Sequence, residues 1–206
     1  MSVTIRHEQG IAVELVPEMD RWPWSTCPGA IQQLQATFTG VALDAFQDRG
    51  EKRANCTHLH DLATLGAKHA FDREQLVYDV LVSDPIDGRC DAELRRNGQT
   101  LLKWVLVNDK FLEPAEAAGE SLLKLNPYIA SLDASLQEPA RILRWGSMIA
   151  HGRAMSLEAL SDASAMPVGN CFTFQAHVRT DAKHVGEIRD FSRGTAKPLD
   201  KRGAAA

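Results

Sequence analysis

The stretch that decides the fold is RCDAELRRNGQTLLKWVLV, residues 89–107. At its centre, Asn97-Gly98 separates two runs rich in strand-forming residues. This dipeptide is the strongest short signal for a β-hairpin, because both turn residues tolerate positive φ. A third run precedes the hairpin and is joined to it through Pro85-Ile86-Asp87-Gly88. The sequence therefore predicts three antiparallel strands in a meander, over residues 76–83, 89–96 and 99–107.

Working outward, apolar residues at helical spacing predict helices on both sides of the meander. One helix opens at Pro28 and ends at Gly40, and a second follows Cys56, with Asn55 or Thr57 as its cap. Residues 113–137 are expected to be helical but broken at Asn126-Pro127, and Pro139 is expected to open a further helix. Residues 11–16 are expected to form a short strand that ends at Pro17, and period-two alternation predicts a strand over residues 171–178.

Together these elements predict an α+β fold, in which a small antiparallel meander sheet packs against several helices. A single domain is expected over residues 1–180. A charged, partly disordered tail is expected over residues 181–206.

Composition excludes several classes of protein. The chain has 206 residues, 23 basic and 27 acidic side chains and a net charge of −4, which argues against nucleic acid as a partner. No apolar run reaches the ~18–20 residues needed to cross a bilayer, so no membrane partner is expected. The first ten residues lack a signal-peptide core, so we expect a cytoplasmic protein whose four cysteines are reduced thiols.

Two cysteines lie where the first two helices are predicted to begin. Cys27 directly precedes Pro28, and Cys56 directly precedes Thr57-His58. A helix N-terminus presents free N–H groups that stabilise a thiolate, so both are candidate catalytic residues. The alternative is that both are small buried apolar residues.

A histidine and an aspartate follow Cys56 at helical spacing. Asp61 lies three residues after His58, within reach of one imidazole nitrogen, so His58 is a candidate base oriented by Asp61. His60 points to another face, and His69 is about 16 Å further along the helix, too far to share a metal ion with His58. His58 could otherwise be an ordinary helix-start residue.

The meander contributes Lys103, which alternates with apolar neighbours. We consider it either a gatekeeper on an edge strand or a desolvated amine in the active site. Asp87-Gly88 is expected to be an ordinary turn.

Aromatic and polar residues near these candidates are expected to bind the substrate, although such aromatics commonly seal the edge of a core instead. They are Trp22, Trp24, Tyr78, Trp104, His151 and Arg153. No nucleotide-binding or Gly-x-Ser-x-Gly motif is present, so we predict no cofactor, and the leading interpretation needs no metal ligand.

The runs WPWSTCPGA (residues 22–30) and NCTHL (residues 55–59), followed by Asp87-Gly88, resemble a bacterial family of uncharacterised domains marked by a Cys-Thr-His-Leu signature. The resemblance covers roughly residues 10–180. The family is associated with organisms that degrade aromatic compounds, which implies an aromatic substrate.

Residues 26–70 are also distantly similar to iron–sulfur cluster assembly scaffolds, in which cysteines open two helices. In this chain the strands follow the helices, which corresponds to a circular permutation of the scaffold, and Asn55 stands where the scaffold has histidine. The resemblance implies a scaffold-like core, with Cys90 as the third cysteine.

Three functions are compatible with these residues. The leading one is a cofactor-independent lyase that acts by retro-aldol cleavage or elimination on an aromatic or apolar small molecule. The second is a metal or iron–sulfur protein using Cys27, Cys56 and Cys90, and the third is a non-catalytic binding subunit. A small-molecule substrate is the expected partner, and homo-oligomerisation is left open.

Overall fold

The computed structural model describes residues 1–154 and 162–186, and the chain divides into two compact units. The first unit contains residues 1–72 together with 162–186, and the second unit contains residues 73–154, inserted between these two segments. Helices, a two-stranded sheet and a four-stranded antiparallel sheet confirm the α+β class. The single domain expected over residues 1–180 implies cooperative unfolding of both units, and it stays a prediction.

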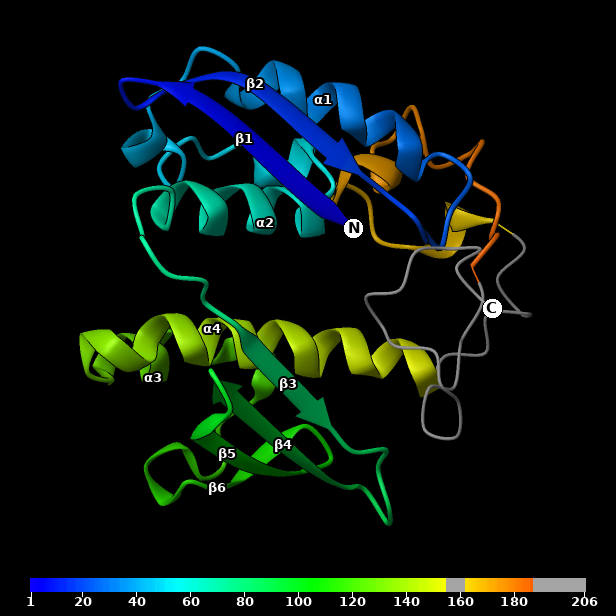
Figure 1. Cartoon of the computed structure of the whole chain (residues 1–206). Helices are drawn as coiled ribbons and strands as arrows, with labels where there is room; N and C mark the ends of the chain where they lie inside the picture. Colours follow the sequence, from blue (N-terminus) through cyan, green and yellow to red (C-terminus); the bar gives the residue numbers. More distant parts are fainter. Residues whose placement is uncertain (155–161, 187–206) are drawn as a thin grey trace, which may run out of the picture. The chain divides into compact units, whose positions relative to one another are not determined.

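In the first unit, a β-hairpin packs on two helices. Strands β1 (Ser2–Glu8) and β2 (Ile11–Glu18) pair antiparallel beside α1 (Ala30–Phe38) and α2 (Thr57–Lys68) (Figure 1). The sequence predicted β2 and both helices but missed β1. Their shared core is mainly aliphatic and aromatic, and its fully enclosed members include Leu15, Leu34, Phe38, Phe46 and Leu59.

The cap of α2 differs from the prediction. The N-cap residue is Cys56, without a side-chain hydrogen bond to the helix, rather than Asn55 or Thr57. Asn55 is fully buried, and its Nδ2 donates to Thr37 Oγ1 at 3.0 Å and to the Glu51 carbonyl at 3.0 Å. Its amide is therefore used to join α1 to the segment before α2.

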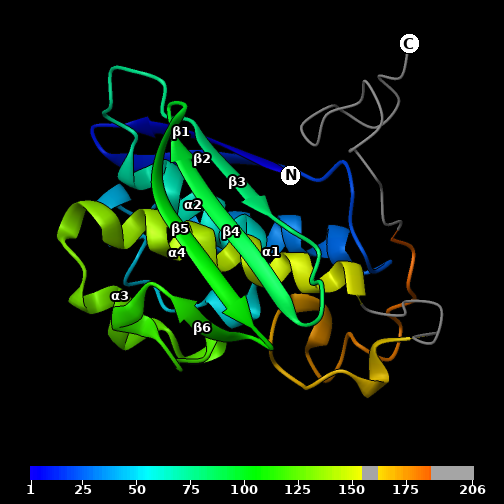
Figure 2. The same cartoon turned by 90° about the horizontal axis from the view of Figure 1, so that it is seen from below.

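The second unit contains the predicted meander, which is confirmed with one additional strand. Its order is β3 (Tyr78–Val82), β4 (Arg89–Arg96), β5 (Gln99–Val107) and β6 (Lys110–Glu113), all antiparallel (Figure 2). Asn97 and Gly98 adopt φ of 49° and 81°, as the tight hairpin requires. Asp87-Gly88 forms the other two-residue turn, closed by a hydrogen bond from Arg89 N to the Ile86 carbonyl.

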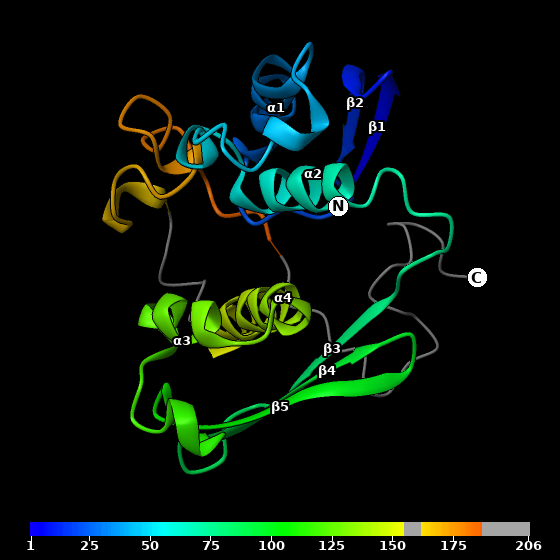
Figure 3. The same ribbon diagram turned by 90° about the vertical axis from the view of Figure 1, so that its left-hand side faces the viewer.

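Two helices complete this unit, and their starts differ from the prediction. The helix expected from residue 113 is wrong, because only single 3-10 turns lie between residue 113 and Asn126. Asn126-Pro127 starts α3 (Asn126–Ser131) instead of breaking a helix, because proline is tolerated in a first turn. Pro139 lies inside α4 (Ala134–Ala150) instead of opening it. One face of α4 packs on β3, β4 and β5 (Figure 3).

Single 3-10 turns link these elements in both units. They are Cys27–Gly29, Leu43–Ala45, Lys52–Ala54, Ala115–Ala117, Leu122–Lys124, His151–Ala154, Ala163–Ala165 and Phe172–Phe174.

The strand predicted over residues 171–178 is wrong. Its Phe–x–Phe alternation instead belongs to the 3-10 turn Phe172–Phe174, which sends the two rings into different clusters. Phe172 packs against the core of α1 and α2, whereas Phe174 packs against Trp24. Two partly buried rings two residues apart therefore gave the sequence pattern of a strand without forming one.

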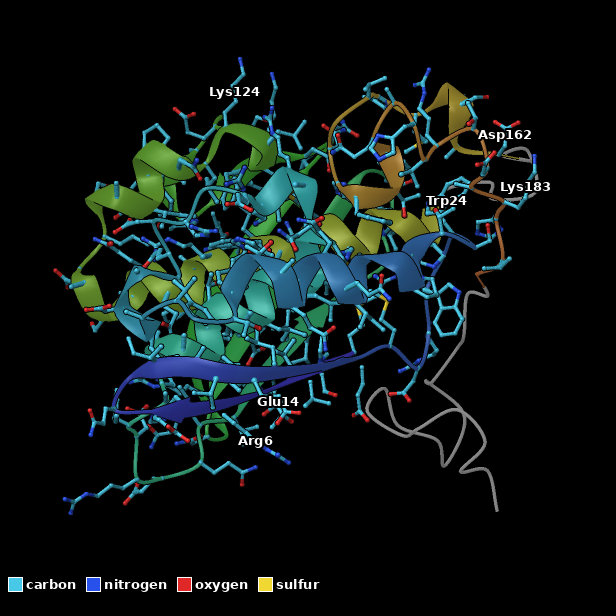
Figure 4. The ribbon with its side chains drawn as sticks, turned by 90° about the horizontal axis from the view of Figure 1, so that it is seen from above. Arg6, Glu14, Trp24, Lys124, Asp162 and Lys183 are labelled. Carbon is cyan, nitrogen blue, oxygen red and sulfur yellow. The ribbon has the colours of Figure 1, made fainter. Side chains whose placement is uncertain are left out.

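The start of the predicted tail is packed. Ala182 is fully buried, Lys183 N donates to Ser25 Oγ at 3.0 Å, and Val185 N donates to the Pro23 carbonyl at 2.8 Å. Figure 4 labels Lys183 beside Asp162, with which it forms an isolated β-bridge. The disorder predicted further on falls on residues 187–206, which lie outside the described residues.

Candidate functional site

The starts of α1 and α2 meet at the turn around Phe172. Phe172 N donates to the Asn55 carbonyl at 2.9 Å, and Gln175 Nε2 donates to the Arg53 carbonyl at 2.8 Å. On the other side, the Phe172 ring packs so closely on Gly29 that a Cβ there would lie 3.1 Å from the ring. This turn therefore touches the segments that carry both predicted cysteines.

Three thiols gather here, and the third is Cys171. Cys27 and Cys56 are 8% and 7% exposed, and Cys171 is partly buried. Cys27 Sγ lies 3.4 Å from Thr173 Oγ1. An ionised Cys27 or Cys171 would raise the pKa of Cys56, which places the three thiols in the same region of the first unit. That Cys27 and Cys56 share one cavity stays a prediction.

Burial outweighs the helix-terminus effect on these thiols. The pKa of Cys56 is raised, chiefly by burial, although the backbone N–H groups of Leu59 and His58 oppose the shift. Burial also raises the pKa of Cys171. The expected stabilised thiolate at Cys56 is wrong, because desolvation of the charged form exceeds what the helix start supplies.

His58 lies directly beside Cys56. Its Nδ1 is 3.8 Å from Cys56 Sγ, and its side chain reaches the surface. The surrounding protein lowers the pKa of His58, mainly through burial; Asp61 opposes this shift, and Lys52 and the amino terminus add to it. The imidazole is therefore neutral at pH 7.

Asp61 holds a lysine rather than the histidine. Both of its carboxylate oxygens accept from Lys52 Nζ, at 2.6 and 2.8 Å. Burial raises the pKa of Asp61, and the hydrogen bonds from Lys52 oppose the shift. Over residues 1–154 and 162–186 no hydrogen bond joins Asp61 to His58, so the predicted orienting contact is wrong and Asp61 acts on His58 only through its charge.

His60 points into the core, as its helical position predicted. It is 5% exposed, and its ring lies 5.1 Å from that of Phe38. Neither ring nitrogen has a hydrogen-bond partner within the described part of the chain, and burial lowers the pKa of His60 to about 4.

The two tryptophans before Cys27 lie in the same unit as the thiols. Trp24 is 6% exposed and packs edge-on against Phe174 and His184, in a small cluster that includes Cys27. Trp22 is partly buried against this cluster. These contacts match the alternative in which aromatic residues seal the edge of a core.

Two further candidates, Lys103 and Trp104, lie on β5 in the second unit. The Lys103 side chain is 70% exposed and lies 3.8 Å from Glu93, so the interpretation as a desolvated amine is wrong. β5 pairs on both sides, so Lys103 is not on an edge strand either. Trp104 is 1% exposed and packs edge-on against Phe111 in the core.

The remaining candidates have partners within the second unit. Tyr78 Oη donates to the buried Glu138 at 2.9 Å, and burial together with this carboxylate raises the pKa of Tyr78 to about 12. His151 Nε2 lies 2.9 Å from Asp109, and Arg153 Nε lies 2.8 Å from Asp84.

Cys90 also belongs to the second unit. It is on β4, where its Sγ donates to the Ser83 carbonyl at 3.2 Å. Within the part of the chain that the structure describes, no group of three or more His, Cys, Asp or Glu side chains is arranged to hold a metal ion.

Sequence reasoning missed three residues of the site: Lys52, Cys171 and Thr173. Cys171 was assigned to a predicted strand. The sequence offered one clue to it: among the four cysteines, Cys171 alone had been given no possible role.

Comparisons with known proteins add no relative. No family model matches the chain, and no curated protein or solved structure matches it either. The resemblances to the Cys-Thr-His-Leu family and to iron–sulfur scaffolds therefore stay predictions. Among the helices that the structure describes, none combines the length and apolar character needed to cross a membrane.

Proposed function

We propose that the protein is a cofactor-independent enzyme of the lyase type, which acts on an aromatic or apolar small molecule with His58 as its general base. One observation carries the proposal. His58 reaches the surface with a lowered pKa, and its Nδ1 lies 3.8 Å from Cys56 Sγ where two helices begin. A neutral imidazole at neutral pH is the form that can accept a proton.

The surroundings of His58 favour an uncharged substrate. Raised pKa values keep Cys56 and Cys171 as neutral thiols at pH 7. Neutral sulfhydryl groups are weakly polar, which suits an apolar ring better than a charged group.

The proposed reaction is a retro-aldol cleavage. His58 takes the hydroxyl proton of a β-hydroxy carbonyl compound as the carbon–carbon bond breaks, which yields an aromatic aldehyde and an enolate. The enolate then regains a proton from the imidazolium. Lys52, held by Asp61, is a cation of this unit that acts on His58, as the amino terminus also does, and Lys52 supports the developing anion.

The candidate cations Lys103 and Arg153 have no role in this proposed reaction. Those two residues lie in the second unit, where Glu93 and Asp84 are their ion-pair partners. Asp61 is thus a positioning residue in this proposal.

The test uses the full chain with a panel of aromatic β-hydroxy ketones and β-hydroxy acids, and follows release of the aldehyde by ultraviolet absorbance. His58→Gln should lower turnover by about 10²–10⁴-fold, the usual contribution of a general base. His177→Gln, at an exposed turn position, is the matched control and should leave turnover unchanged.

Equal turnover in His58→Gln and wild type would remove His58 from the mechanism, and no cleavage of any panel member would remove the lyase proposal. Elemental analysis of the same preparation covers the alternative of a metal protein. About one zinc or iron per chain would replace the proposal with a thiolate metal site, since such sites are normally fully occupied.

A further inference from the structure

One backbone hydrogen bond joins the residues next to Cys56 and Cys171. Phe172 N donates to the Asn55 carbonyl. Both cysteines have an extended backbone, with φ −62° and ψ 115° at Cys56 and φ −159° and ψ 179° at Cys171. A second bond, from the Gln175 side chain to the Arg53 carbonyl, joins the same two segments.

This hydrogen bond brings the two cysteines close together. Cys171 is linked directly to Phe172 N and Cys56 directly to the Asn55 carbonyl group, so only these two peptide groups separate the two Cα atoms. A disulfide forms between cysteines whose Cα atoms lie about 4.4–6.8 Å apart. Both thiols are free in this structure.

We infer that Cys56 and Cys171 form a reversible disulfide when a hydroperoxide oxidises the protein, and that this bond switches the site off. Formation of the disulfide does not depend on the proposed function, whereas the expected loss of turnover rests on it. The bond would consume the thiol beside His58 and tie the Phe172 turn to the start of α2.

The chemistry proceeds in two balanced steps. Cys171, the more accessible of the two thiols, attacks the terminal peroxide oxygen; the O–O bond breaks, an alcohol leaves with the thiol proton, and a sulfenic acid remains. Cys56 Sγ then attacks the Cys171 sulfur, the S–O bond breaks and water leaves. Overall the two thiols lose two electrons to form the disulfide, and the hydroperoxide gains these electrons to form an alcohol and water.

His58 supports the second step. Its Nδ1 lies 3.8 Å from Cys56 Sγ, where it can take the thiol proton and return it to the departing hydroxide. This help matters because the buried Cys56 is otherwise protonated at pH 7, and the thiolate is the form that attacks.

The decisive experiment needs no variant. The full chain is treated with hydrogen peroxide, its free thiols are alkylated, and its peptides are mapped by mass spectrometry without reduction. The expected product is one cross-linked peptide joining Cys56 to Cys171, with Cys27 and Cys90 alkylated, and dithiothreitol should reverse it. A link from either cysteine to Cys27, or oxidised cysteines without a link, would overturn the inference.

Two variants sharpen this result. His58→Gln should form the cross-link at least about 10²-fold more slowly at neutral pH, the lower end of what a proton-transfer group contributes, and an unchanged rate would overturn the role of His58 in it. Cys90→Ser, which changes a thiol of the second unit, should cross-link at the wild-type rate.

The readouts separate the inference from the proposed function. Oxidation should lower turnover more than tenfold, and dithiothreitol should restore it. If the wild-type chain shows no turnover but the Cys56–Cys171 link forms, the proposed function fails and the disulfide stands; turnover that survives complete cross-linking overturns the switch.

Discussion

The two units treat their buried polar groups differently. In the second unit, the buried Glu138 accepts a hydrogen bond from Tyr78, and the charged side chains of β4 form ion pairs on an exposed face. Its buried nitrogen without a partner among the described residues, Trp104 Nε1, belongs to an indole that does not titrate. The first unit buries the imidazole of His60, which has no hydrogen-bond partner among the described residues, and two thiols with raised pKa values. Because buried ionisable or nucleophilic groups of this kind are common at functional sites, the difference favours the first unit in the search for function.

The largest effect on stability is expected from the core of the second unit. Trp104→Ala should lower the free energy of unfolding by about 3–5 kcal/mol, because a fully buried indole leaves a cavity. Guanidinium unfolding measures this change. Lys103→Ala, one residue away on the exposed face, is the control and should stay within about 0.5 kcal/mol of wild type.

Hydrogen exchange on Trp104→Ala also tests the single domain predicted over residues 1–180. One cooperative domain requires that α2 amides in the first unit lose protection together with those of β4. Unchanged protection in α2 would instead make the two units separate folding domains.

A smaller effect should appear in the first unit as acid sensitivity. The pKa of His60 is about 4 in the fold against 6.5 for the free side chain. The unfolded chain binds the proton first, so this contribution to stability is complete above pH 6.5 and is lost as the pH falls toward 4. Its size is about 3 kcal/mol, since a pKa lowered from 6.5 to about 4 corresponds to 1.36 kcal/mol for each pKa unit.

Unfolding measured between pH 7 and pH 4 checks the assignment to His60. His60→Phe replaces the unpartnered ring with an apolar one beside Phe38 and should flatten the pH dependence by that amount. His177→Phe, at an exposed turn, should leave the slope unchanged. An identical slope in His60→Phe and wild type would contradict the assignment.

The smallest effect concerns how closely α4 approaches β3. A Cβ at Gly146 would overlap the Val80 side chain, so Gly146→Ala should destabilise the protein by about 1–3 kcal/mol. Gly152→Ala, where a Cβ meets nothing within 4 Å, is the matched control. A thermal melt comparing the two variants decides whether this contact is as tight as the structure indicates.

The predictable part of the fold is the part with local signals. Asn97-Gly98 sets the hairpin by its own backbone preference, and Pro28 starts a helix by its missing N–H. The strand predicted at Phe172 failed, because alternation shows only that two side chains are buried, not that they share a face.

The site residues also divide into those with a local sequence signal and those without one. Cys56 and His58 were predicted from one short run of sequence, and the structure places them 3.8 Å apart. Cys171 could not be predicted, because its position beside Cys56 depends on one long-range hydrogen bond to Asn55. The spacing likewise predicted a hydrogen bond between Asp61 and His58. In the structure both carboxylate oxygens of Asp61 instead accept from Lys52, which lies nine residues earlier.

Because the second unit is inserted within the first in the sequence, the residues of the site are synthesised at different times. Cys27 and Cys56 are translated first, then the whole meander with α4, and only afterwards Cys171, which lies 115 residues after Cys56. At typical elongation rates this delay lasts roughly 6–20 s. During that interval the nascent helices lack the Phe172 turn that later covers their first residues, so the centre matures last, as translation of residues 162–186 is completed.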